Sequence, residues 1–336
     1  MGYYAQSVGG HLHLMRRARP VPDWLAEGST PEALRERLQL ALRMRDFAVA
    51  ELGLPDNASY RSYADLGRSS VVWNVVATPE LSLTLKTWCF PVMGCVGYRG
   101  YFEQAEAESM AAQLRGQGLE VNVYGVPAYS TLGWTNWLGG DPLLSTFLRW
   151  PEADLARLIF HELAHQTAYA SDDTMFNESY ATAVERLGVA RWTVHTGHVG
   201  EDAASARRRA DFKALALRTR DTLAALYRSD LPEADKRRRK AEVFAAMRAE
   251  YAAMKAGPWG GFAGYDGWMS RANNASIAVQ AAYDGLVPEF ERLFEQQGRD
   301  FARFHAEVKR LAALPKEERR ATLAALSAAR APATPR

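Results

Sequence analysis

Residues 151–166 read PEADLARLIFHELAHQ, and the interpretation of the whole chain starts from this stretch. Glu152 and Asp154 open it after a proline, where negative charge favours the first turn of a helix. The apolar residues that follow predict a helix over residues 155–170. That helix carries His161-Glu162-Leu163-Ala164-His165, an HExxH pattern. Because residues four apart lie one turn apart on the same helix face, both imidazoles can reach one point.

The HExxH pattern predicts a metal site. Imidazole is a ligand that Zn²⁺ prefers, and a catalytic zinc ion takes three protein ligands and keeps one position open. Glu162 is rotated by about 100° from His161 around the helix, so we expect it not to bind the ion. It can instead hold a water molecule beside the ion and take its proton. Two histidines that merely find partners on a helix face are the alternative, and the helical context favours the metal site.

A third ligand is expected on the next helix. The segment FNESYA places Glu178 thirteen residues after His165, and polar residues between them can turn the chain. Asp172 and Asp173 are rival ligands, although a position in the turn also suits them to cap the following helix. Glu185 shares a helix face with Glu178. It could hold a ligand histidine in place, or be an ordinary surface carboxylate.

The remaining pattern predicts an α+β, mostly helical chain. Strands are expected near 71–76, 81–85 and 119–124, and helices near 30–52, 103–117 and 177–192, with two long charged helices within 201–256 that break near 229–232. We therefore expect an N-terminal α/β part over residues 1–150 and a helical part over 151–327. The tail 328–336, rich in alanine and proline, is expected to be disordered.

Charge and hydropathy exclude several classes of protein. Lys and Arg total 41 against 39 Asp and Glu, a net charge of +2, which argues against a dedicated nucleic-acid-binding protein. The basic clusters 207–209 and 236–240 have acidic neighbours, so they are interpreted as solvated helix faces. No apolar run approaches the roughly 18 residues of a membrane-spanning helix.

Two cysteines, Cys89 and Cys95, lie close together in the sequence. They match no four-ligand zinc finger. They are either small buried residues or a local disulfide, which would imply an oxidising compartment. The first residues, Met1-Gly2-Tyr3-Tyr4-Ala5, have no apolar signal core, so the protein is either cytoplasmic or has a leader outside the given sequence.

The chain resembles the gluzincin branch of zinc metallopeptidases and, more closely, a bacterial family of predicted zinc-dependent aminopeptidases. The resemblance covers nearly the whole chain. It rests on the segments Tyr3-Tyr4-Ala5-Gln6, Cys89-Phe90-Pro91, Tyr98-Arg99-Gly100-Tyr101-Phe102, 128–134 (AYSTLGW), 161–166 (HELAHQ) and Asn273-Asn274-Ala275. In classical gluzincin aminopeptidases the glutamate follows the HExxH helix after a longer segment than here.

The resemblance implies a zincin-like fold in which His161, His165 and Glu178 bind Zn²⁺. It also implies a lipoprotein signal before the given sequence, and hence a lipid-anchored periplasmic protein that meets the membrane only through that anchor. This compartment favours a Cys89–Cys95 disulfide.

The resemblance to zincins also suggests where a peptide substrate binds. The strand before the HExxH helix is often a sheet edge that pairs with a peptide main chain, and Tyr129, Ser130, Thr131, Leu132 and Gly133 are in that place. A buried strand is the alternative, and both can hold. Peptide hydrolysis also needs a donor for the developing oxyanion. The candidates are Tyr169, His195, Tyr265 and Tyr283, and Tyr283 is preferred.

The sequence thus predicts a zinc-dependent peptidase with a peptide substrate and Glu162 as general base. The resemblance favours an aminopeptidase. An endopeptidase of the same mechanism and a non-catalytic, zinc-stabilised envelope scaffold are the alternatives. Substrate preference and oligomeric state are not predicted.

Overall fold

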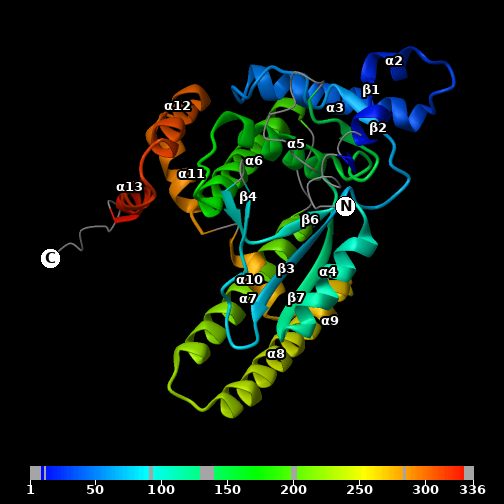
Figure 1. The fold of residues 1–336 in the computed structure, drawn as a ribbon. Coiled ribbons are helices and arrows are strands. Elements are labelled where there is room, and N and C mark those ends of the chain that lie inside the picture. Colours follow the sequence, from blue (N-terminus) through cyan, green and yellow to red (C-terminus); the bar gives the residue numbers. More distant parts are fainter. Residues whose placement is uncertain are drawn as a thin grey trace. The chain divides into compact units, whose positions relative to one another are not determined.

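The chain is described from a computed structural model, which covers residues 9–10, 13–90, 94–128, 140–197, 203–282 and 285–328. It is α+β and mostly helical, as the sequence predicts. Figure 1 shows its helices and strands coloured along the sequence. Within the described residues, no helix combines the length and the apolar character needed to span a membrane.

The chain divides into two compact units, each built from segments that are distant in sequence. Unit 1 comprises residues 1–71, 126–200 and 283–336, and unit 2 comprises residues 72–125 and 201–282. The HExxH segment belongs to unit 1. Each unit is described by itself below.

Unit 1 is a group of helices with one small sheet. Its helices are α2 (Val21–Ala26), α3 (Glu32–Ala50), α5 (Glu152–Thr167), α6 (Thr174–Thr196), α11 (Val287–Gln296), α12 (Phe301–Ala312) and α13 (Lys316–Ala328). The sheet has the order β1 (Arg19–Pro20), β2 (Ser62–Ala64) and β8 (Leu143–Leu144), with β1 antiparallel and β8 parallel to β2. Helices α5 and α6 pack against each other and form the centre of the unit.

The core of unit 1 lies around α6. Its buried face carries Phe176 and Tyr180, and Phe290 of α11 and Phe304 of α12 pack against them with ring centroids 5.1–5.8 Å apart. Burial of such rings from water is the main stabilising contribution in a core of this kind. The aromatic contacts fix α6, and α6 carries Glu178.

Unit 2 combines a three-stranded sheet with a helical hairpin. The sheet order is β6 (Arg99–Tyr101), β3 (Val72–Pro79) and β7 (Leu119–Val126), and helix α4 (Gln104–Gly116) packs on β3. The hairpin consists of α7 (Ala203–Arg228) and α8 (Glu233–Ala256), followed by α9 (Asp266–Arg271) and α10 (Asn274–Ala282). Helix α10 packs against both α7 and β3 and so joins the hairpin to the sheet.

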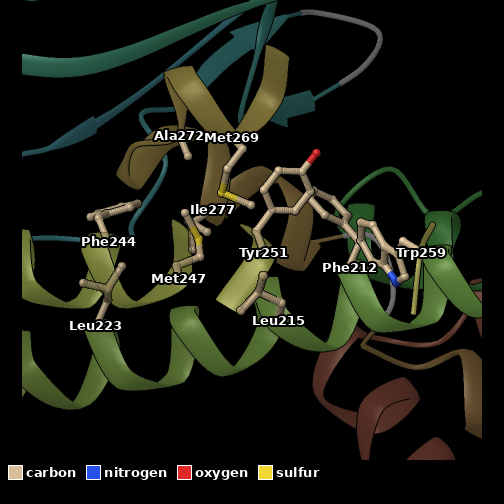
Figure 2. Close-up of a cluster of buried hydrophobic side chains, with 10 residues drawn as sticks. All are labelled: Phe212, Leu215, Leu223, Phe244, Met247, Tyr251, Trp259, Met269, Ala272 and Ile277. Carbon is tan, nitrogen blue, oxygen red and sulfur yellow. The ribbon is translucent and has the colours of Figure 1, made fainter. Parts of the chain in front are cut away.

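The hairpin has its own hydrophobic core, shown in Figure 2. Ten buried residues from α7, α8, α9, α10 and their connections form it: Phe212, Leu215, Leu223, Phe244, Met247, Tyr251, Trp259, Met269, Ala272 and Ile277. The segment that connects α8 to α9 is therefore anchored by a buried aromatic residue, Trp259, although it is rich in glycine.

Most expected elements are found, but one strand is wrong. The expected helix near 103–117 and the break between two long helices are confirmed. Residues 82–87 form no strand despite their alternating pattern. The carbonyl oxygens of Glu80 and Ser82 instead accept hydrogen bonds from the Asn274 side chain, at 2.7 and 3.1 Å. The side-chain amide of Asn274 thus satisfies carbonyl oxygens that, in a strand, would accept hydrogen bonds from a neighbouring strand.

Candidate metal centre

Helix α5 presents the HExxH residues as their spacing predicts. It begins at Glu152 after Pro151, whose carbonyl oxygen accepts the first hydrogen bonds of the helix. His165 is buried, and His161 and Glu162 are half-buried. The two imidazole rings stand edge to face with centroids 4.8 Å apart, so both point to the same side of the helix.

Helix α6 begins at a strong N-terminal cap, and this cap determines where Glu178 lies. The Asp173 carboxylate accepts a hydrogen bond from the backbone N–H of Phe176, at 3.1 Å. It also binds the guanidinium groups of Arg319 and Arg320 from α13. Burial alone would raise the pKa of Asp173, but these hydrogen bonds outweigh it, and its pKa is lowered. Asp172 likewise binds Arg319, at 3.0 Å. Both aspartates that were alternative candidates for the third metal ligand are therefore paired with arginines.

Three side chains from the two helices converge. The Nε2 atoms of His161 and His165 lie 3.2 Å apart. One Glu178 carboxylate oxygen lies 3.4 Å from the first of these nitrogens and 3.7 Å from the second. Among the described residues, this is the one group of histidine, cysteine or acidic side chains arranged so that it could hold a metal ion. We name it the metal group.

Glu185 fixes the ring of His161. One of its carboxylate oxygens lies 2.9 Å from His161 Nδ1. Because an ionised carboxylate only accepts hydrogen bonds, Nδ1 donates to Glu185, and Nε2 is the ring nitrogen that faces the other two members of the metal group. His165 differs, because its buried Nδ1 has no hydrogen-bond partner among the residues that the structure describes.

The charges around the metal group favour a cation. Burial alone would lower the pKa of His161, but hydrogen bonds to Glu178 and Glu185 and the charge of Glu162 raise it well above its ordinary value. Burial would raise the pKa of Glu178, yet the two histidines lower it strongly. Carboxylates that stabilise a proton on an imidazole would equally stabilise a metal ion in its place.

Glu162 stands beside the metal group without a partner of its own. Within the described part of the chain, its carboxylate makes no hydrogen bond or ion pair. Its charge raises the pKa of His161 and of the buried hydroxyl of Tyr60. A free carboxylate next to a possible metal position is available to accept a proton.

The comparison with known protein families identifies the family of the chain. The model of a family described as "Putative aminopeptidase" matches residues 2–323. The chain belongs to this family. The match supports a peptidase with peptide substrates, and it covers both units. No curated protein and no solved structure matches the chain.

The candidate oxyanion donors and the candidate peptide-binding segment are not part of the metal group. Tyr169 follows α5, and burial and the charge of Glu178 raise its pKa. His195 lies at the end of α6 against Phe47 and Trp192. Tyr265 stacks on Phe212 within unit 2. Tyr283 and the segment Tyr129, Ser130, Thr131, Leu132 and Gly133 lie outside the described residues, as do residues 329–336 of the expected disordered tail.

The two cysteines are joined in unit 2. Strands β4 (Trp88–Phe90) and β5 (Gly94–Val96) form an antiparallel pair in which Cys89 stands directly opposite Cys95. Their sulfur atoms form a disulfide.

A segment distant in sequence supports the end of the HExxH helix, and the sequence does not predict it. Gln166 accepts a hydrogen bond from Asn57 Nδ2, at 2.8 Å, and donates one to the hydroxyl of Ser59, at 3.2 Å. In the sequence, residues 54–57 indicate a turn, and residues 58–60 indicate no element. No local signal could have revealed these contacts, because the partners are more than 100 residues apart.

Proposed function

We propose that this member of the family is a zinc-dependent aminopeptidase with a zincin-like fold. His161, His165 and Glu178 would hold the ion, and Glu162 would act as general base. The observation that carries the proposal is the convergence of two imidazole nitrogens and one carboxylate oxygen beside a free carboxylate on the same helix. The family supports the peptidase activity.

The donor distances fit zinc. In a tetrahedral zinc site with bonds of about 2.0–2.1 Å, neighbouring ligand atoms lie about 3.3–3.4 Å apart. The three distances here are 3.2, 3.4 and 3.7 Å. Two nitrogens and one carboxylate oxygen are also the donor set of many catalytic zinc sites, which leave the fourth position for water or substrate.

The chain's own residues supply the proton transfers. Zinc in this position would make water a stronger nucleophile and would polarise a peptide carbonyl group. The Glu162 carboxylate accepts the proton of the attacking water and then delivers it to the nitrogen of the departing amine. Glu185 keeps the proton of His161 on Nδ1, so Nε2 stays available as a ligand.

Three further assignments belong to the proposal. Tyr129, Ser130, Thr131, Leu132 and Gly133 would bind the peptide main chain. Tyr283 would donate to the oxyanion. The periplasm would be the compartment, with a lipid anchor on the full-length precursor, and the Cys89–Cys95 disulfide supports an oxidising environment of this kind.

The first test combines metal analysis with paired substrates. The metal content of the purified protein is measured, and cleavage is compared for peptides with free and N-acetylated amino termini. We expect one zinc ion per chain and cleavage of the free peptides alone. Glu162→Gln should keep zinc and lose turnover, whereas Glu36→Gln, at an exposed position on α3, should change neither.

Other outcomes would select the alternatives. Cleavage of acetylated peptides would indicate an endopeptidase that uses the same residues. Zinc without hydrolysis of any peptide would favour a zinc-stabilised scaffold of the envelope. A Glu162→Gln protein with full activity, or a protein that binds no metal, would refute the proposed mechanism.

A further inference from the structure

Tyr60 has a backbone conformation that its sequence does not explain. Its φ angle is 63°, in the left-handed region that residues other than glycine, asparagine and aspartate rarely adopt. Such a conformation costs about 1–3 kcal/mol and persists only where the surroundings enforce it. Residues held in such conformations cluster at functional sites, which makes the contacts of Tyr60 informative about function.

The contacts that hold Tyr60 connect it to the HExxH helix. Its backbone N–H donates to the carbonyl oxygen of Asp141, at 2.6 Å. The preceding residue, Ser59, binds Gln166, which directly follows the second histidine of the motif. Gly140 allows the approach, because a Cβ atom there would lie 2.5 Å from the backbone nitrogen of Ser59. Tyr60 is therefore fixed relative to α5.

The hydroxyl group of Tyr60 is buried and unsatisfied. The residue is 1% exposed, and within the described segments its Oη atom has no hydrogen-bond partner. An unsatisfied buried polar group costs about 1–3 kcal/mol, and phenylalanine would fill the same space without that cost. We therefore expect an interaction that compensates the cost of burying the hydroxyl group.

Glu162 lies one helical turn before Gln166 on the same face of α5, and Gln166 contacts Ser59, so Glu162 lies on the helix face that meets the Tyr60 segment. Glu162 makes no hydrogen bond or ion pair within the described part of the chain, although it is half-buried. After burial itself, the charge of Glu162 is the strongest influence that raises the pKa of Tyr60, ahead of the charge of Asp141. The hydroxyl thus stays protonated, as a donor, beside a carboxylate that lacks one.

We propose that Tyr60 is a positioning residue for Glu162, and that its hydroxyl donates a hydrogen bond to the Glu162 carboxylate when the protein works. The hydrogen bond restricts the carboxylate to one orientation, which general-base catalysis requires. This inference rests on the proposed function for the role of Glu162, but the contact itself can be tested without activity.

The contact is tested by thermal unfolding of a double-mutant cycle. If the hydroxyl reaches Glu162, Tyr60→Phe should lower the Tm by about 3 °C in the wild-type background and should leave it unchanged or raise it in a Glu162→Leu background. If the hydroxyl stays unsatisfied, Tyr60→Phe should be as stable as the wild type or more stable in both backgrounds. That result would overturn the inference.

The role is tested by kinetics on the metal-loaded full chain. Tyr60→Phe should lower kcat about 10-fold and change KM less than about 2-fold, since a loss of orientation affects the transition state and not substrate binding. Zinc content should stay the same. Tyr63→Phe is the matched control, because Tyr63 is also buried in unit 1 but is influenced by Asp65 and Arg149 and not by Glu162. It should leave kcat unchanged.

The outcomes separate this inference from the proposed function. A thermal coupling without any change in kcat would overturn the positioning role. If the wild-type protein hydrolyses no peptide, the proposed function fails, and the thermal cycle still decides whether Tyr60 and Glu162 form the contact.

Discussion

Acidification should destabilise unit 1 through one buried histidine, His305. This residue lies on α12, is 4% exposed, and has both ring nitrogens in hydrogen bonds. Nε2 lies 2.8 Å from the carbonyl oxygen of Leu52, and Nδ1 lies 2.7 Å from the hydroxyl of Tyr180. Because a carbonyl oxygen only accepts, Nε2 carries the proton and Nδ1 accepts from Tyr180. This is the neutral ring.

The size of the effect follows from the pKa. Burial lowers the pKa of His305 to about 4, against a value of 6.5 for an exposed histidine. The unfolded chain therefore binds a proton between these values and the folded chain does not. The contribution of His305 is fully present above about pH 6.5 and is lost as the pH falls towards 4. Between about pH 7 and about pH 5 the loss should be about 2 kcal/mol.

The measurement compares urea unfolding of the wild type and His305→Gln at about pH 7 and about pH 5. Glutamine keeps a donor and an acceptor but does not titrate. The comparison is needed because His161, whose pKa is raised, contributes with the opposite sign: its stabilisation is present at low pH and lost as the pH rises. Equal losses of unfolding free energy in the two proteins would refute the reasoning.

Three further predictions concern the supports of the two units. Asp173→Asn should lower the unfolding free energy at neutral pH by about 3–5 kcal/mol, because the buried Arg319 then lacks its buried partner. The variant protein that remains folded should still bind zinc. Asn274→Ala should destabilise unit 2 by about 2–4 kcal/mol in chemical denaturation, since its side chain satisfies two carbonyl oxygens and the hydroxyl of Tyr227, at 2.8 Å. Glu185→Gln should weaken zinc affinity about 10–100-fold in a chelator competition while the protein stays folded; an unchanged affinity would contradict its role on His161.

The metal group was predictable because its geometry is local. Two histidines one helical turn apart must share a face, and a glutamate on the next helix needs only a short turn to meet them. Helix α6 begins seven residues after α5 ends. The sequence therefore predicted His161, His165 and Glu178 as a group, and the described structure brings them within 4.8 Å of one another.

The supports of the metal group could not be predicted in this way, because each depends on a partner far along the chain. Tyr180 and His305 are separated by 125 residues, and Asp173 and Arg319 by 146. Tyr60 shows the same limit: the predicted turn ends at residue 57, while the backbone N–H of Tyr60 is bound by the distant carbonyl oxygen of Asp141. Periodicity predicts which face of a helix carries the ligands, but the pairing of distant segments decides whether a carboxylate is a ligand, as proposed for Glu178, or a cap, as Asp173 is.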